Sequence, residues 1–187
     1  MNGKEMEKKL IEHCAPTLAG LKCASLFNYF HEGESIVQEE LEEINKMLNR
    51  KGVNVDVLIW KEKSALVYTY RRAMLEKELK NPGVAELLER YGYESCEIDS
   101  CLKYLKHRLL CCSCFPHEIG VFLGYPLEDV KGFIENEGRN CESCGIWKVY
   151  CNSEEKDKLF QKLKKCRDVY LRVFCAGGEL SQMTVYT

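Results

Sequence analysis

Proline is scarce in this sequence, and no run of apolar residues is long. The chain has 4 prolines in 187 residues, whereas collagen-like and low-complexity chains are rich in proline. Apolar runs such as VLIW are far shorter than the roughly 18 residues that a membrane-spanning helix requires. The charged start, MNGKEMEKKLIEHC, lacks the apolar core of a secretory signal. We therefore expect a compact cytoplasmic protein without a membrane partner.

A large net charge is also absent. The 27 basic residues nearly balance the 29 acidic residues, which gives a formal net charge of −2. Such a balance provides no global positive field to attract the phosphates of DNA or RNA. We therefore expect no nucleic-acid partner.

Cysteine, in contrast, is abundant, with 12 residues. In a secreted chain this number would indicate a disulfide scaffold, but in a reducing cytoplasm we expect free thiols, metal ligands or buried core residues. A chain of 187 residues can bury about 70% of its unfolded surface, so neither disulfides nor a metal is required merely for folding.

Hydrophobic periodicity predicts both helices and strands. Apolar residues recur at helical spacing over 4–14, 36–50, 72–80, 84–91, 96–110 and 153–174. Strand-like patterns occur near 18–29, 53–60, 65–71 and 146–150. We predict an α+β fold, with one small, mainly antiparallel sheet and several packed helices, in a single domain over residues 1–187.

A helix-turn-helix-like pattern occupies residues 116–136. An eight-residue helix, a turn at Gly124 and a second helix are the expected elements. The second helix carries Glu128, Asp129 and Glu135, which would repel phosphates. We interpret this segment as a packing device that does not bind DNA.

Two cysteine motifs raise the question of a metal site. Cys112, Cys114 and His117 form a Cys-x-Cys-x-x-His pattern, and Cys141 with Cys144 forms a Cys-x-x-Cys pair. Thiolates and imidazoles are ligands that zinc and iron–sulfur clusters prefer. However, the long segment between the motifs is untypical of a zinc finger. Zinc or iron is possible but not favoured, and we predict no obligatory structural metal.

The remaining candidate site residues are a thiol, an imidazole and several charged groups. Cys14 could act as a nucleophile if His117 meets it in space, with Glu118 as a further acid–base group. The alternative is that Cys14 fills the core and that Glu118 caps a helix. His13, Lys22 and Lys148 could bind a ligand or cofactor, but lysines in strands more often extend to the surface.

Two blocks of the chain resemble an uncharacterised bacterial family, domain of unknown function 3793. The blocks are HCAPTLAGLKCASLF (13–27) and FPHEIGVFLGYPLEDVKGFIENEGRNCESCGIWKVY (115–150). The resemblance implies a cytosolic bacterial protein with one family-wide domain and no established activity. His13, Cys14, His117, Glu118, Cys144 and Lys148 fall inside the matching blocks, whereas Cys111, Cys112 and Cys114 lie just before the second block.

Three functions remain open from the sequence. The leading hypothesis is a binding or accessory protein that holds a small ligand or a soft metal where the HCAPTL and PHEIG segments meet. The second is a thiol-dependent enzyme that uses Cys14 and His117, and whether the protein is an enzyme stays uncertain. The third is an interaction module with a protein partner and no site at all.

Overall fold

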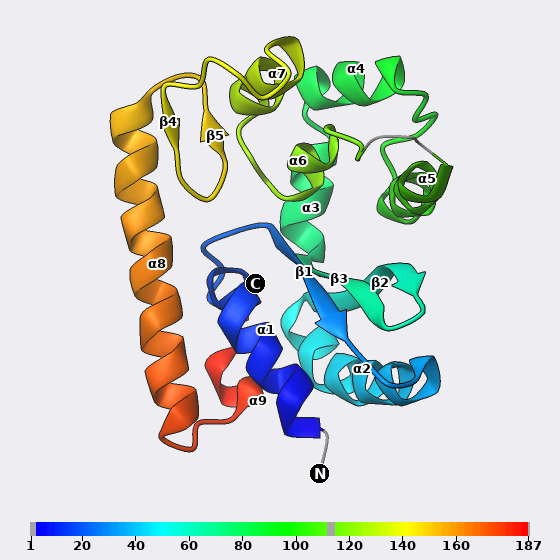
Figure 1. Ribbon diagram of the computed structural model, residues 1–187, viewed down its shortest axis with the longest axis vertical. Helices are drawn as coiled ribbons and strands as arrows, with labels where there is room; N and C mark the ends of the chain where they lie inside the picture. The colour runs from blue at the N-terminus through cyan, green and yellow to red at the C-terminus, as the bar shows by residue number, and fades with distance from the viewer. Residues whose placement is uncertain (1–2, 112–114, 187) are drawn as a thin grey trace. The chain divides into compact units, whose positions relative to one another are not determined.

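The computed structural model describes residues 3–111 and 115–186 of the chain (Figure 1). The chain divides into two compact units. Unit 1 comprises residues 1–74 and 166–187, and unit 2 comprises residues 75–165. Both contain helices and a small antiparallel sheet, which confirms the predicted α+β class. The single domain over residues 1–187 stays a prediction.

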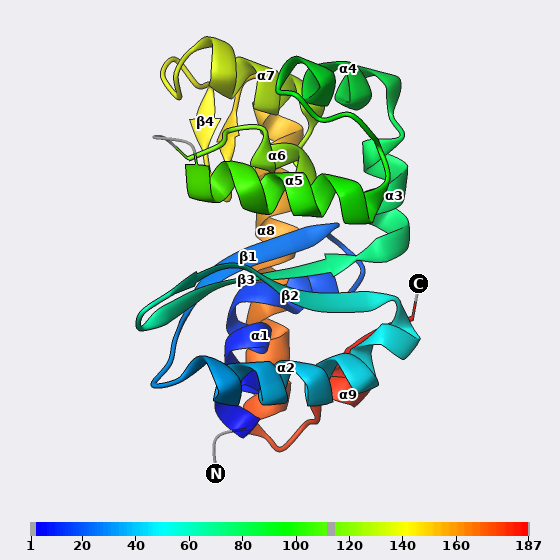
Figure 2. The same ribbon diagram turned by 90° about the vertical axis from the view of Figure 1, so that its right-hand side faces the viewer.

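Unit 1 contains a three-stranded sheet in the order β1-β3-β2. Its elements are α1 (Gly3–Leu18), β1 (Ala24–Phe30), α2 (Glu34–Leu48), the 3-10 turn η1 (Asn49–Lys51), β2 (Val53–Lys61), β3 (Ser64–Arg71), the start of α3 (Arg72–Leu79), the end of α8 (Ser153–Cys175) and α9 (Leu180–Met183). Figure 2 shows α1 and α2 on the same side of the sheet. Residues such as Leu10, Leu41 and Val55 form the core between these layers.

Unit 2 is mainly helical. Its elements are the rest of α3, α4 (Pro82–Arg90), α5 (Ile98–Cys111), α6 (Ile119–Phe122), α7 (Leu127–Glu135), β4 (Ser143–Cys144), β5 (Lys148–Val149) and the first part of α8. Strands β4 and β5 pair with each other in a separate antiparallel sheet. The prediction that all strands share one sheet is therefore wrong.

The strand predicted near 18–29 is also wrong in its first part. Helix α1 continues through Pro16 to Leu18, and β1 begins only at Ala24. Leu10, Cys14 and Leu18 are fully buried at i, i+4 and i+8, which is helical spacing. The stabilisation from burying this face exceeds the cost of the backbone hydrogen bond that Pro16 cannot donate.

The helix-turn-helix-like pattern is only partly present. Helix α6 has 4 residues rather than eight. The turn at Gly124 has a φ of 68°, as the sequence pattern requires. Asp129 on α7 is buried, with 2% of its surface exposed, so it is not part of an exposed acidic face.

No helix in the described part of the chain is both long enough and apolar enough to cross a membrane. Cytoplasmic location stays a prediction.

Candidate functional site

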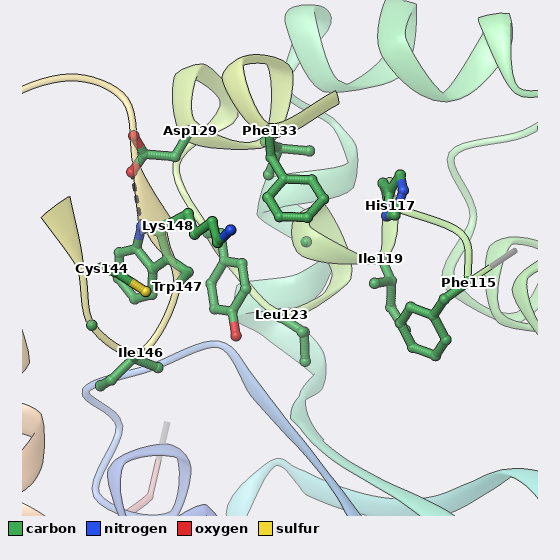
Figure 3. Close-up of a pocket in the computed structure, with 14 residues that line it drawn as sticks. Phe115, His117, Ile119, Leu123, Asp129, Phe133, Cys144, Ile146, Trp147 and Lys148 are labelled. Atoms are coloured by element: carbon green, nitrogen blue, oxygen red, sulfur yellow. Dashed lines mark hydrogen bonds between the residues drawn. The ribbon is translucent and has the colours of Figure 1, made fainter. Parts of the chain in front are cut away.

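A largely apolar cavity of about 360 Å³ lies within unit 2. The segment from Phe115 to Phe133 forms one wall, and the β4–β5 hairpin forms the other (Figure 3). Five of its lining residues carry rings: Phe115, His117, Tyr125, Phe133 and Trp147. We call this cavity the unit 2 pocket. Its volume lies within the range of about 300–1,000 Å³ that is usual for small-molecule sites.

Glycine allows the two elements of the first wall to approach closely. A Cβ atom at Gly120 on α6 would lie 2.8 Å from Val130 Cγ2 on α7, closer than side chains tolerate. Both Gly120 and Val130 line the pocket. The position of α6 against α7 therefore depends on the missing side chain at Gly120.

The buried carboxylate of Asp129 holds the hairpin wall in place. Its Oδ2 accepts a hydrogen bond of 2.8 Å from the Trp147 indole, and its Oδ1 accepts one of 2.8 Å from the Tyr150 backbone N–H. The Lys156 ammonium lies 4.0 Å from Oδ2. A single side chain thus joins α7 to both the strand region and the start of α8.

Aromatic packing fixes the orientation of Trp147. Its ring stacks on Tyr125 with 4.7 Å between centroids and meets Phe160 edge-on at 4.5 Å. Leu163 and Val149 are buried in the same cluster. Trp147 can therefore present a rigid ring surface to the pocket.

Three polar side chains of the pocket are candidates that the sequence had suggested. His117 packs edge-on against Phe133, with 5.0 Å between ring centroids. The Lys148 ammonium donates a hydrogen bond of 2.5 Å to the Gly138 carbonyl and lies 6.0 Å from the Phe133 centroid. Cys144 also lines the pocket. The fold therefore brings together three predicted site residues, His117, Lys148 and Cys144.

Glu118, although adjacent to His117, does not line the unit 2 pocket. Its carboxylate is fully buried, forms an ion pair with Arg108 at 2.5 Å and accepts a hydrogen bond from the Tyr93 hydroxyl at 3.3 Å. Burial and the neighbouring Glu118 raise the pKa of Tyr93. Both contacts are made by Oε1 of Glu118, and the role of this residue as an acid–base group stays a prediction.

Cys14 belongs to unit 1 and is fully buried. Its thiol donates a hydrogen bond of 3.5 Å to the Thr69 hydroxyl. Burial raises the pKa of the Cys14 thiol to about 12. A nucleophilic cysteine needs the opposite shift, since the thiolate is the reactive form. His117 belongs to unit 2, so its pairing with Cys14 stays a prediction.

The other two ligand-binding candidates also belong to unit 1. The His13 ring stacks on Phe27 with 5.0 Å between centroids, and partial burial lowers its pKa. Burial lowers the pKa of Lys22 to about 8. Neither residue lines the unit 2 pocket.

The structure describes only two of the four cysteines that the metal hypothesis names. Cys112 and Cys114 lie outside the described residues. Cys141 is partly exposed and Cys144 is exposed. Among the residues that the structure describes, no group of three or more His, Cys, Asp or Glu side chains could hold a metal ion. Whether Cys112, Cys114, Cys141 and Cys144 bind zinc or iron stays untested.

Sequence reasoning missed other residues that line the pocket. Asp129 had been interpreted as part of an exposed acidic face, and Trp147 and Phe133 had not been singled out. The sequence did contain one signal that could have placed these two residues together. Phe133 follows Asp129 by four residues, so both lie on the same face of α7.

Comparison with known proteins assigns the family. No curated protein and no solved structure matches the chain significantly. The model of the family described as "Protein of unknown function (DUF3793)" matches residues 10–184. The matched range includes the two sequence blocks at 13–27 and 115–150 and every residue that lines the unit 2 pocket. The protein therefore belongs to the DUF3793 family.

Proposed function

We propose that the protein binds a small, flat, largely apolar molecule in the unit 2 pocket. The observation that carries this proposal is the ring-lined cavity of about 360 Å³. An apolar cavity of about 150 Å³ is enough for benzene. The unit 2 pocket therefore has room for a ligand of about two fused rings.

Rigid walls favour binding, because side chains that are already ordered lose little conformational entropy when a ligand binds. Trp147 is held by Asp129, Tyr125 and Phe160. Phe133 contacts both His117 and Lys148. A flat ligand would contact aromatic faces and edges, and each such contact typically contributes about 0.5–1.5 kcal/mol beyond the buried area.

This proposal moves the site suggested by the sequence. The pocket lies beside the PHEIG segment, but its second wall comes from GIWKVY rather than from HCAPTL. A thiol-dependent reaction at Cys14 is less well supported, because burial raises the pKa of that thiol to about 12.

The test uses the fluorescence of Trp147. Because the chain has 2 tryptophans, Trp60 in unit 1 is replaced by phenylalanine to leave Trp147 as the reporter. Titration with the neutral probe 2-naphthamide should change its emission in a saturable way. In the same background, Phe133→Ala should weaken binding about tenfold, which corresponds to about 1.4 kcal/mol.

Phe30→Ala is the matched control, since Phe30 lies in unit 1, is 77% exposed and does not line the pocket. It should leave the affinity unchanged. Absence of saturable binding, or binding that Phe133→Ala and Phe30→Ala affect equally, would contradict the proposed function.

A further inference from the structure

The charged groups that line the unit 2 pocket are not equivalent. Asp129 and Lys148 both contribute to its lining. The carboxylate of Asp129 has both oxygens engaged, one by the Trp147 indole and the other by the Tyr150 backbone N–H. The Lys156 ammonium also lies 4.0 Å from this carboxylate. The negative charge of Asp129 is therefore already compensated and is unsuited to bind a cationic ligand.

Lys148 differs, because its contacts carry no opposite charge. Its ammonium donates to the Gly138 carbonyl at 2.5 Å and lies 6.0 Å from the Phe133 centroid. Within the described ranges 3–111 and 115–186, no carboxylate forms an ion pair with it. An ammonium has three N–H donors. Two of these donors remain for a ligand.

The geometry holds this ammonium at the pocket. Lys148 begins β5, which pairs with β4 across the hairpin. Figure 3 shows its side chain extending from the hairpin toward the Phe133 ring. The Gly138 carbonyl fixes the far end of the side chain. The cation is thus positioned before any ligand binds.

We propose that the natural ligand is an apolar carboxylic acid, with about two fused rings, whose carboxylate pairs with Lys148. The inference rests on the proposed function, since it names the class of ligand for the same pocket. An attraction between opposite charges strengthens where apolar walls exclude water. One cation matches one negative charge, so a monoanion fits better than a phosphate dianion.

His117 is a second polar group of the pocket, on the wall opposite the hairpin that carries Lys148 (Figure 3). Its ring meets Phe133 edge-on, and Phe133 also lies beside the Lys148 ammonium. An imidazole N–H can donate a hydrogen bond to a carboxylate oxygen. His117 is therefore a second donor that a further polar group of the ligand can reach, apart from the Lys148 ammonium.

The experiment compares three probes of the same shape and different charge. They are 2-naphthoate, 2-naphthamide and 2-naphthylmethylammonium, titrated against the full chain with Trp60→Phe. We expect 2-naphthoate to bind at least about tenfold more tightly than the neutral amide. We expect the ammonium probe to bind most weakly.

Variants of Lys148 test whether its ammonium causes the preference for naphthoate over naphthamide. Lys148→Met should remove the preference for naphthoate but retain naphthamide binding, which also shows that the variant is folded. Lys148→Arg should retain the preference. Lys158→Met is the matched control, because Lys158 is exposed on α8 in unit 2, does not line the pocket and removes the same charge.

The outcomes separate the two proposals. Equal binding of naphthoate and naphthamide to the Trp60→Phe chain would overturn the anionic ligand but leave the proposed function in place. A naphthoate preference that survives Lys148→Met would overturn the role of Lys148. Failure of all three probes to bind would overturn both proposals.

Discussion

The Trp147 indole nitrogen donates a 2.8 Å hydrogen bond to the carboxylate of Asp129, 18 residues earlier in the chain. Asp129 is 2% exposed and Trp147 is 8% exposed, so the buried indole N–H depends on this carboxylate for a partner. This pair joins α7 to the β4–β5 hairpin, and both elements line the unit 2 pocket. The first prediction concerns this pair.

Asp129→Ala should lower the free energy of unfolding by about 2–4 kcal/mol, because the buried N–H groups of Trp147 and Tyr150 lose their acceptor. Asp129→Asn should cost less, since its amide oxygen can still accept one bond. Urea unfolding followed by tryptophan fluorescence measures both. Glu128→Ala, one residue earlier and exposed, should change stability by less than about 0.5 kcal/mol. Equal effects at positions 128 and 129 would contradict the assigned role.

A second prediction concerns the buried guanidinium of Arg71 in unit 1. It donates hydrogen bonds of 2.5 Å to the Thr17 and Leu18 carbonyls and one of 3.0 Å to the Val185 carbonyl. Arg71→Met leaves these acceptors without their charged donor, so we expect a loss of about 2–4 kcal/mol in unfolding free energy.

Hydrogen exchange gives Arg71→Met a local readout. The Val185 amide donates to the Leu18 carbonyl and should exchange faster in this variant. Arg50→Met is the control, because Arg50 is exposed. Unchanged protection of the Val185 amide would show that Arg71 does not hold the C-terminal segment.

The third prediction concerns the pH dependence of unit 1 stability. Burial raises the pKa of Cys14 from 9.0 to about 12. Above about pH 9 the unfolded chain releases this thiol proton while the folded chain keeps it. The unfolded state then binds fewer protons, so stability falls as pH rises between about 9 and 12, by at most about 1.4 kcal/mol per pH unit.

Cys14→Ala isolates this contribution. The variant should be less stable near neutral pH because it leaves a cavity, but it should lose less stability than the wild type between about pH 8 and 10. Other titrating groups, including Lys22, are present in both proteins and largely cancel in the comparison. Cys175→Ala, at an exposed thiol, is the control. Parallel loss of stability in wild type and Cys14→Ala, measured by urea unfolding, would refute the effect.

A fourth prediction concerns metal removal. A structural zinc can contribute about 10–16 kcal/mol to the folding of a small domain that lacks a core of its own, whereas apolar residues form a buried core in each unit of this chain. We expect thermal melting to be the same with and without chelator. Stoichiometric zinc or iron, with a chelator-induced loss of folding that Cys112→Ser and Cys144→Ser each reproduce, would establish an obligatory metal site.

Much of the fold could be predicted from local patterns. Val37, Leu41, Ile44 and Leu48 repeat at helical spacing, and all four are buried in α2. The β-branched alternation after Gly52 predicted the β2–β3 hairpin, which pairs from Val53 with Arg71 to Lys61 with Ser64. Such patterns succeed because the side chains that share a face lie only a few residues apart.

Prediction failed where distant packing outweighed a local signal. Pro16 favoured the end of a helix, yet burial of Cys14 and Leu18 extends α1 beyond it. The acidic first turn of α7 favoured a solvent-exposed face, yet Asp129 is buried by hydrogen bonds to residues about twenty positions later. Composition and spacing contain no information about which distant donors will reach a carboxylate.

The sequence by itself determined the α+β class, most helices, the β2–β3 hairpin and three side chains of the candidate site, His117, Cys144 and Lys148. Only the tertiary structure decided that these three line one pocket with Phe133 and Trp147, and that Cys14 is buried in unit 1. The reason is physical. Helices and strands follow from hydrophobic periods of a few residues, whereas a pocket forms where segments distant in sequence pack against each other, through contacts such as Asp129 with Trp147.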